Sequence, residues 1–307
     1  MNEFDFIEKY LSSNKKSNKF SLNFKDDVGY ANNSIFSTDT ICEGVHFNTD
    51  DNPFYVAKKL IRVNVSDVIA KGIAPKFCLL NLSLGKSVNE AWLKKFMKGF
   101  NEDLSLYKLN LIGGDTTNTL QKTVLSLTIF SDLKNKKFIK RSSAKNNNFI
   151  YVTGTIGDSS LGLYCIKNLN LKLPKKYLNY LKKRYLVPEP RFELASFINK
   201  NASSSTDISD GLYSDLNNIC KASGLGADIY FPKIPISKAA LKLIAVKSNL
   251  KERVINGGDD YEILFTGPKG LDRKENITMI GKMTNGNKIN FIDFDDSIKL
   301  DGYKHEI

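Results

Sequence analysis

The sequence predicts a mixed α/β (α+β) protein built from two related domains, and three observations support this prediction. At 307 residues, the chain is longer than a single hydrophobic core usually serves. Segments with strand patterns alternate with segments whose apolar residues recur at helical spacing. A short acidic motif also occurs twice, which predicts an internal repeat.

Strand and helix patterns follow one another in both halves of the chain. In the first half, we expect strands at residues 33–40, 76–84, 110–115 and 123–130 and helices at 52–63 and 89–107. In the second half, we expect strands at residues 149–155, 227–231, 261–267 and 277–283 and helices at 160–168, 189–198, 212–223 and 237–246. No Pro-rich or low-complexity linker separates the halves, so we expect them to pack firmly.

The repeated motif is NVSD at residues 64–67 and DISD at residues 207–210. A second pair follows in the same order, because Asp115 lies 48 residues after Asp67 and Asp259 lies 49 residues after Asp210. Two matches at nearly equal spacing indicate a duplicated domain. We therefore divide the chain into residues 1–140 and 141–307.

Composition and charge favour a reduced, cytoplasmic protein. The net charge is +12, but the lysines are scattered and form no stripe with interleaved aromatic residues, so a nucleic-acid partner is disfavoured. The longest apolar runs have strand length, which excludes a membrane helix, and the N-terminus has no signal-peptide pattern. The four cysteines form no CxxC pair and are interpreted as reduced.

Acidic residues recur beside Ser, Thr or Gly at five places, at residues 25–27, 37–40, 66–67, 113–116 and 207–210. A single such site could be only a helix cap or a turn, and Ser66–Asp67 taken alone favours a cap. Asp39 and Asp115 each follow an apolar run, so we expect both at strand ends, where α/β folds gather ligands. If the five sites converge, each close pair of carboxylates is repelled by about 4 kcal/mol, so a cation must hold them together.

Oxygen ligands without a His or Cys cluster suit magnesium ions (Mg²⁺) better than zinc. Magnesium held by carboxylates commonly accompanies nucleotide phosphates. The usual phosphate-binding and kinase motifs are missing, and the glycine-rich stretch 154–162 has the spacing of a turn. Phosphates would then be held by metal ions and helix N-termini. His46, which follows the acids of residues 37–40, is either structural or part of this site.

The motifs, taken in order, resemble the thiamine-monophosphate kinase family, whose superfamily includes aminoimidazole ribonucleotide synthetase and selenophosphate synthetase. The resemblance extends over nearly the whole chain. Its motifs are DD, STDTICEGVHF, VNVSDVIAKGIAP, LIGGDTT, RSSAK, YVTGTIGDSSLGL, VPEPR, DISDGLYSDL, NGGDDYE and DGYKH. The elements STDTxxEGVHF and the terminal Gly-Tyr favour the kinase over its relatives.

The resemblance implies two α/β domains and a homodimer whose N-terminal halves form a β-barrel. Residues 1–140 would bind ATP and Mg²⁺ and form the dimer contact, and residues 141–307 would form the second α/β domain. The implied reaction is direct in-line transfer of the γ-phosphoryl group of ATP to thiamine monophosphate, which gives thiamine diphosphate. Several Mg²⁺ ions would assist the transfer.

The resemblance also implies roles for individual residues. The implied metal ligands are Asp27, Ser37, Thr38, Asp39, Asp67, Asp115, Asp207 and Asp210. The implied ATP contacts are Gly114, Asp115, Arg141 and Ser209, and the implied substrate contacts are His46, Asp259 and Tyr303. Asp39, Asp115 and Arg141 would contribute most to catalysis, while Asp215 is expected to be a surface or packing residue.

Two positions depart from the family pattern, and two other functions stay open. Lys25 stands where the family usually has Gly, and Asp259 stands where it has Glu. The first alternative function is another ATP-using member of the superfamily with a different phosphorylated acceptor. Selenophosphate synthetase is disfavoured, because no Cys-containing glycine-rich segment lies near the N-terminus. The second alternative is a non-catalytic basic protein that binds nucleic acid.

Overall fold

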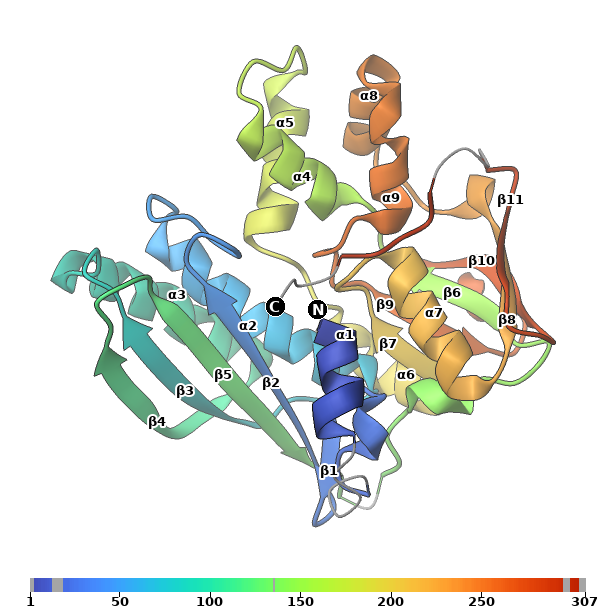
Figure 1. The fold of residues 1–307 in the computed structure, drawn as a ribbon, viewed down its shortest axis with the longest axis horizontal. Helices are drawn as coiled ribbons and strands as arrows, with labels where there is room; N and C mark the ends of the chain where they lie inside the picture. Colours follow the sequence, from blue (N-terminus) through green and yellow to red (C-terminus); the bar gives the residue numbers. More distant parts are fainter. Residues whose placement is uncertain (1–2, 13–18, 135, 295–298, 304–307) are drawn as a thin grey trace.

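A computed structural model describes residues 3–12, 19–134, 136–294 and 299–303. The protein contains two β-sheets, each flanked by helices (Figure 1). The helix-rich N-terminal segment comprises α1 (Glu3–Phe6) and a π-helical turn at Ile7–Leu11. Within the described residues, no helix is both long enough and apolar enough to cross a bilayer.

The first sheet has five strands in the order β1-β2-β5-β3-β4. Its strands are β1 (Gly29–Ala31), β2 (Ser34–Cys42), β3 (Phe77–Leu84), β4 (Asn110–Asn118) and β5 (Val124–Asp132). The β3–β4 pair is parallel and the other pairs are antiparallel. Alternate residues of β5 are buried, as expected for a sheet with one face against a core. Strand β4 is an edge strand and is exposed at every position.

Two long helices cover the buried face of this sheet, α2 (Pro53–Ala70) and α3 (Glu90–Tyr107). Asparagine side chains begin both helices: Asn52 accepts from the N–H of Phe54, and Asn89 accepts from the N–H of Trp92. Gly99 of α3 lies directly against the backbone of Phe54, where a side chain would collide. The two helices therefore pack closely because a glycine stands at their contact.

The second sheet has six strands in the order β11-β8-β10-β6-β9-β7. Its strands are β6 (Phe149–Thr153), β7 (Ser204–Asp207), β8 (Gly226–Tyr230), β9 (Ile263–Gly267), β10 (Ile277–Thr284) and β11 (Ile289–Ile292). The α-helices of this half are α4 (Asp158–Lys167), α5 (Lys175–Leu186), α6 (Ala195–Asn201), α7 (Leu212–Ser223), α8 (Lys238–Val246) and α9 (Arg253–Asn256). Short 3₁₀ turns occur at Leu22–Phe24, Arg141–Ser143, Phe192–Leu194, Phe231–Lys233, Ser248–Glu252 and Leu271–Arg273.

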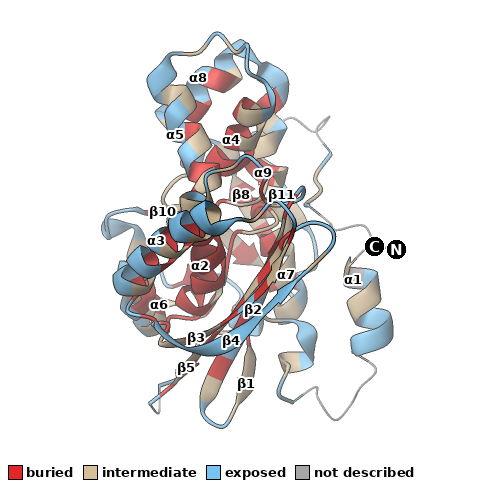
Figure 2. Cartoon of the chain, turned by 90° about the vertical axis from the view of Figure 1, so that its left-hand side faces the viewer, coloured by how far each residue is buried: buried red, intermediate tan, exposed pale blue. Residues whose placement is uncertain are grey.

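Helix α2 lies between the two halves and is buried along most of its length (Figure 2). It packs on β2 and β5 of the first sheet and on β7 of the second. The largest apolar core continues into the second half, where Tyr151 and Phe265 stack with ring centroids 5.2 Å apart. The expected firm packing of the two halves is thus confirmed, and α2 can carry side chains to the junction.

Most of the expected elements are present, with some corrections. The eight expected strands are all found, and the structure adds elements that the sequence patterns do not predict: β1, β7, β11, α1, α5 and α9. Asp39 and Asp115 lie within β2 and β4, so the expectation that they end strands is wrong. Asp67 lies in the last turn of α2, so its expected capping role is also wrong.

The repeated motif does not mark equivalent elements. Residues 64–67 are helical, while residues 207–210 form the end of β7 and the loop that follows it. The two sheets also have different strand orders. The two copies of the motif therefore lie in different secondary structure. The division at residue 140 stays a prediction.

Candidate functional site

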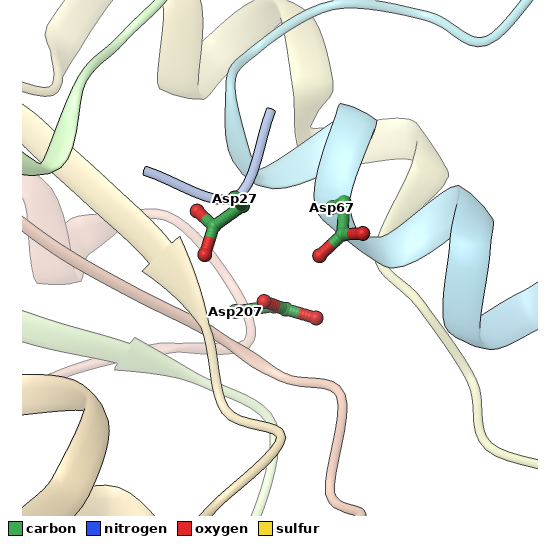
Figure 3. A group of neighbouring side chains, drawn as sticks. All are labelled: Asp27, Asp67 and Asp207. Carbon is green, nitrogen blue, oxygen red and sulfur yellow. The ribbon is translucent and has the colours of Figure 1, made fainter. Parts of the chain in front are cut away.

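The carboxylates of Asp27, Asp67 and Asp207 converge, with one oxygen of each lying within 4.8 Å of the others (Figure 3). We call these three residues the acid cluster. Asp27 lies in the loop before β1, Asp67 in the last turn of α2, and Asp207 at the end of β7. Three segments far apart in the sequence therefore meet where the two halves join.

Strand β2 adds two polar residues beside the acid cluster. The hydroxyl of Ser37 donates a hydrogen bond to Oδ2 of Asp67. The N–H of Asp39 donates to the side-chain oxygen of Asn64 on α2, at 2.8 Å. Since side chains alternate along a strand, Ser37 and Asp39 share the face that points toward α2.

Thr38 lies on the opposite face of β2 and is exposed. Its hydroxyl donates to the carbonyl of Leu127 at 3.2 Å and accepts from Thr128 at 3.0 Å. The structure therefore does not bring the Thr38 hydroxyl to the acid cluster. Only the backbone of Thr38 is left for the implied metal-ligand role.

Burial dominates the electrostatics of the acid cluster. Together with the nearby charge of Asp27, it raises the pKa of Asp39, which lies beside the cluster, to about 6 and that of Asp207 to about 7. Burial and the charges of Asp39, Asp207 and Asp27 raise the pKa of Asp67 well above its ordinary value. The site therefore requires either bound protons or a cation.

Two basic side chains compensate only one end of the site, at Asp27. Lys71 forms an ion pair with Asp27, and its ammonium lies 2.7 Å from Oδ1 of Asp26. Arg141 pairs with the other oxygen of Asp27 and donates from Nε to Thr206 at 3.1 Å. Burial alone would raise the pKa of Asp27, but the charges of Arg141 and Lys71 outweigh it and hold this pKa below its ordinary value.

The donor set of the acid cluster fits a magnesium ion. Oδ2 of Asp207 is buried and accepts no hydrogen bond from the part of the chain that the structure describes. The atoms available as metal ligands are carboxylate and hydroxyl oxygens, which Mg²⁺ prefers. A small hard cation would satisfy the orphaned oxygen and reduce the repulsion among the carboxylates.

A second group of residues gathers around Lys59 of α2, and we call it the lysine cluster. The ammonium of Lys59 lies 3.2 Å from the carbonyl oxygen of His46 and 3.7 Å from Oδ2 of Asp259. It also lies 3.8 Å from the ring centroid of Tyr185, a cation–π contact. Burial lowers the pKa of Lys59, while Asp259 opposes this shift. The structure thus brings together His46 and Asp259, two of the residues expected to bind substrate.

Backbone hydrogen bonds connect Ser209, Asp210 and Tyr303, which are also expected to contact ligands, with the segment that carries Asp259. The N–H of Asp259 donates to the carbonyl of Ser209 at 2.8 Å, and that of Tyr303 donates to the carbonyl of Asp210 at 3.0 Å. Gly258 lies against the Ser209 carbonyl, where any side chain would collide. The loop after β7, the loop before β9 and the C-terminal segment therefore form one surface.

Asp215 organises that surface from within α7. It is fully buried, and its Oδ2 accepts hydrogen bonds from the N–H groups of Ser209 and Asp210, both at 3.1 Å. Its assignment as a packing residue fits this position, and its function is to shape the loop that carries Ser209 and Asp210.

Tyr261 adjoins the lysine cluster through Asp259. Its hydroxyl donates to Oδ1 of Asp259 at 3.1 Å. Burial raises its pKa well above the ordinary value, and the charges of Asp259, Asp39 and Asp207 raise it further. The Tyr261 hydroxyl therefore contacts Asp259 directly and is within electrostatic reach of Asp39 and Asp207.

Gly114 and Asp115 are not brought to the acid cluster within one chain. They lie on β4, which β5 and β3 separate from β2. Three strand spacings amount to about 14 Å in a flat sheet. Both residues are exposed. Their implied contacts with ATP and metal would therefore need a second protein molecule or a different conformation of this one.

Sequence reasoning missed Lys59, Lys71 and Tyr261. Lys71 lies in the motif VNVSDVIAKGIAP and Tyr261 in NGGDDYE, whereas Lys59 lies on α2 outside the quoted motifs. The sequence contains no signal that Lys71 is buried, since lysines are usually exposed. The only feature of the sequence that points to these three residues is that they lie within or close to the motifs of the resemblance.

Comparisons with known proteins identify the family of this chain. The family models "AIR synthase related protein, N-terminal domain" and "AIR synthase related protein, C-terminal domain" match residues 25–131 and 145–293. The thiamine-monophosphate kinase of Buchnera aphidicola subsp. Schizaphis graminum is 36% identical over 324 aligned positions, covering 100% of this chain and 99% of the relative. The chain belongs to the thiamine-monophosphate kinase family.

Two further members of the thiamine-monophosphate kinase family are similar along most of their length. The enzyme of Escherichia coli (strain K12) is 37% identical, covering 87% of this chain and 83% of the relative. A solved structure of AaThiL complexed with AMPPCP and TMP superposes with a TM-score of 0.89 at 29% identity. That superposition covers 99% of this chain and 97% of the other.

Proposed function

We propose that the protein transfers the γ-phosphoryl group of ATP to thiamine monophosphate and so produces thiamine diphosphate. The observation that supports this most strongly is the buried acid cluster, with a second group at Lys59 that brings His46 and Asp259 together. Phosphoryl transfer between two anions needs such a division, with positive charge at one end and an acceptor site at the other. AaThiL, a structural neighbour, binds an ATP analogue together with TMP.

Mg²⁺ would be held by Asp27, Asp67 and Asp207, with Ser37 and Asp39 next to them. When bound, it supplies the positive charge that phosphate oxygens require. Arg141 lies at the same end of the site and would neutralise a further phosphate oxygen if it exchanged its partner Asp27 for ATP. Ser209 and Asp210 would contact ATP and metal from the loop that Asp215 holds in place.

The acceptor end needs no strong base. A phosphate group is already a nucleophilic anion, so the transfer is proposed to be direct and in line, without a phosphorylated enzyme. His46, Asp259 and Tyr303 would orient the thiamine part of the substrate. Tyr303 is half exposed at 50%, and its N–H donates to the carbonyl of Asp210.

We also propose a homodimer formed through the first sheet, in which the N-terminal halves build a barrel. Strand β4 exposes all nine residues, including Leu111 at 42% and Ile112 at 54%. An open apolar edge strand is normally paired or covered. A second copy across β4 would place Gly114 and Asp115 in the interface, which accounts for their distance from the acid cluster within one chain.

The domain roles and the location follow the same proposal. Residues 1–140 would supply most metal ligands and the dimer contact, and residues 141–307 would supply Arg141, the β7 loop and most of the substrate pocket. A cytoplasmic location stays a prediction, which the presence of cytoplasmic ATP and Mg²⁺ favours. A nucleic-acid partner fits poorly, because the convergent carboxylates would repel phosphate groups unless metal ions intervened.

The test is to incubate the protein with ATP, Mg²⁺ and thiamine monophosphate and to quantify ADP and thiamine diphosphate by chromatography. Equal amounts of both products are expected. A parallel incubation with aminoimidazole precursors tests the alternative within the superfamily. ATP consumption with these precursors, and none with thiamine monophosphate, would refute the proposed acceptor.

A further inference from the structure

Lys71 is the most deeply buried basic residue near the acid cluster. It follows α2 directly, and its side chain is 0% exposed. Its ammonium contacts three oxygens: Oδ1 of Asp26 at 2.7 Å, Oδ2 of Asp27, and the carbonyl of Ser205 at 2.8 Å. A fully desolvated ammonium within an all-oxygen cage has the surroundings that a small metal cation would need.

The lysine shares one of its oxygen partners with the acid cluster. Asp27 points one oxygen at Lys71 and the other at Arg141 and Thr206, while it also lies within the group that would hold a metal. Asp67 and Asp207 have no ion pair with Lys or Arg among the described residues. The positive charge that the chain itself supplies is therefore concentrated at the Asp26–Asp27 end.

This asymmetry controls where a further cation can bind. A fixed ammonium beside Asp27 repels a divalent ion at that end and leaves the Asp67–Asp207 end most negative. It also makes it possible for Asp26 and Asp27 to be buried as anions before any metal arrives. Without the ammonium, these two carboxylates would need a different cation.

We infer that Lys71 is a permanent cation of the metal centre, a positioning residue that occupies the place of a further divalent ion between Asp26 and one oxygen of Asp27. Metal ions are thereby directed to the side of Asp27 that faces Asp67 and Asp207. This inference rests on the proposed Mg²⁺ centre but not on the identity of the phosphate acceptor. It concerns the number of ions that bind and the affinity of the protein for them, and both can be measured without any substrate.

The experiment is a Mn²⁺ titration of the metal-free wild type and of metal-free Lys71→Met. Electron paramagnetic resonance measures the concentration of free Mn²⁺ at each step. Removing one buried positive charge next to the site should tighten the first Mn²⁺ binding step roughly tenfold or more. The rise in Tm on adding Mn²⁺ should also be larger in the variant, because metal then replaces the lost ammonium.

Lys58→Met is the matched control. Lys58 lies on the same helix, and its ammonium forms an ion pair with Oδ1 of Asp103 at 2.8 Å, outside the acid cluster. This variant should lower Tm without changing Mn²⁺ affinity. Lys71→Gln, which is also neutral, serves as the second variant if Lys71→Met does not fold. Folding of either Lys71 variant only in the presence of Mn²⁺ would support the inference.

Unchanged or weaker Mn²⁺ affinity in both Lys71 variants would overturn the inference, as would variants that stay unfolded with Mn²⁺. A wild-type protein that binds no Mn²⁺ overturns the metal centre and this inference together. Normal Mn²⁺ binding without formation of thiamine diphosphate would instead refute the proposed reaction alone. The two failures are therefore distinguishable.

Discussion

Two of the places where the protein buries carboxylates, Glu262 and the acid cluster, differ in the partners that the chain supplies. Glu262, next to β9, is fully buried and accepts hydrogen bonds from Arg184 at 2.8 Å, from Nε of Arg191 at 2.7 Å and from Thr153 at 2.7 Å. Among the described residues, Asp67 and Asp207 form no ion pair with Lys or Arg, and Oδ2 of Asp207 is left without a hydrogen bond.

The difference separates a structural site from a binding site. Around Glu262, the chain supplies every partner that a buried carboxylate needs, and the result ties β6 to the segment between α5 and α6. In the acid cluster, the chain supplies cations only for Asp27, so the remaining charge is left for a ligand. Removing a carboxylate should therefore have opposite consequences at the two places.

Asp207→Asn should have the largest effect on activity. The change removes one ligand and part of the attraction for a divalent ion, so turnover should fall by roughly a thousandfold. The metal-free protein should be as stable as the wild type or more stable, because one of several repelling buried charges is gone. Steady-state kinetics and thermal unfolding in chelator measure both effects, and a variant with near-normal turnover would show that the cluster holds no catalytic metal.

Glu262→Gln should have the largest effect on stability. It leaves Arg184 and Arg191 with an uncompensated charge in a buried setting, which typically costs about 3–5 kcal/mol. The loss should be the same with and without Mg²⁺, because this site has no need for a metal. Denaturant unfolding measures it. A loss that Mg²⁺ restores would contradict the division into a structural and a binding site.

The pH dependence of metal-free stability should come from the acid cluster. The pKa values of Asp39 and Asp207 are raised to about 6 and about 7, so the folded state binds these protons more tightly than the unfolded state. This contribution to stability is fully present below the unfolded pKa near 4. It falls as pH rises from there and is lost above about 7, with a slope of at most about 1.4 kcal/mol per pH unit for each of the two protons.

Unfolding experiments in chelator between pH 4 and 8 would measure this loss, and Asp207→Asn provides the control because it should flatten the curve. Added Mg²⁺ should remove the fall, since the metal favours the ionised carboxylates. Wild-type stability that rises over this range without metal would contradict the raised pKa values.

Asp259→Glu should have the smallest effect. Oδ2 of Asp259 lies 3.7 Å from the Lys59 ammonium, so one added methylene can shorten this contact. Because a partly exposed ion pair contributes at most about 1 kcal/mol, KM for thiamine monophosphate should change by less than about fivefold. Turnover should stay unchanged, and a large loss of turnover would show that Asp259 acts at the reacting phosphates.

The sequence predicted much of the acidic site through its motifs. Asp27, Ser37, Asp39, Asp67 and Asp207 do meet, although their elements differ from those expected. Because side chains alternate between the two faces of a strand, a strand that extends past both residues places the side chains of Ser37 and Thr38 on opposite faces of β2. The expectation that Asp39 ends its strand hid this alternation.

Other features depend on contacts between distant segments and could not be predicted from local patterns. Lys71 is buried because the loop before β1 and strand β7 both cover it with oxygen atoms. The repeat at residues 64–67 and 207–210 was misleading, because a four-residue acidic pattern fits both a helix and a strand end. Strand β7 itself, SSTD, is too short and polar to be recognised as a strand.

The most direct test of the central claim measures thiamine diphosphate formed from ATP and thiamine monophosphate across a Mg²⁺ titration, for the wild type and Asp207→Asn. The wild type should form thiamine diphosphate and ADP in equal amounts, with none in chelator. Asp207→Asn should form almost none, even at saturating Mg²⁺. Equal product with and without chelator, or wild-type rates in Asp207→Asn, would contradict the assignment of the acid cluster as the metal centre of a phosphoryl transfer.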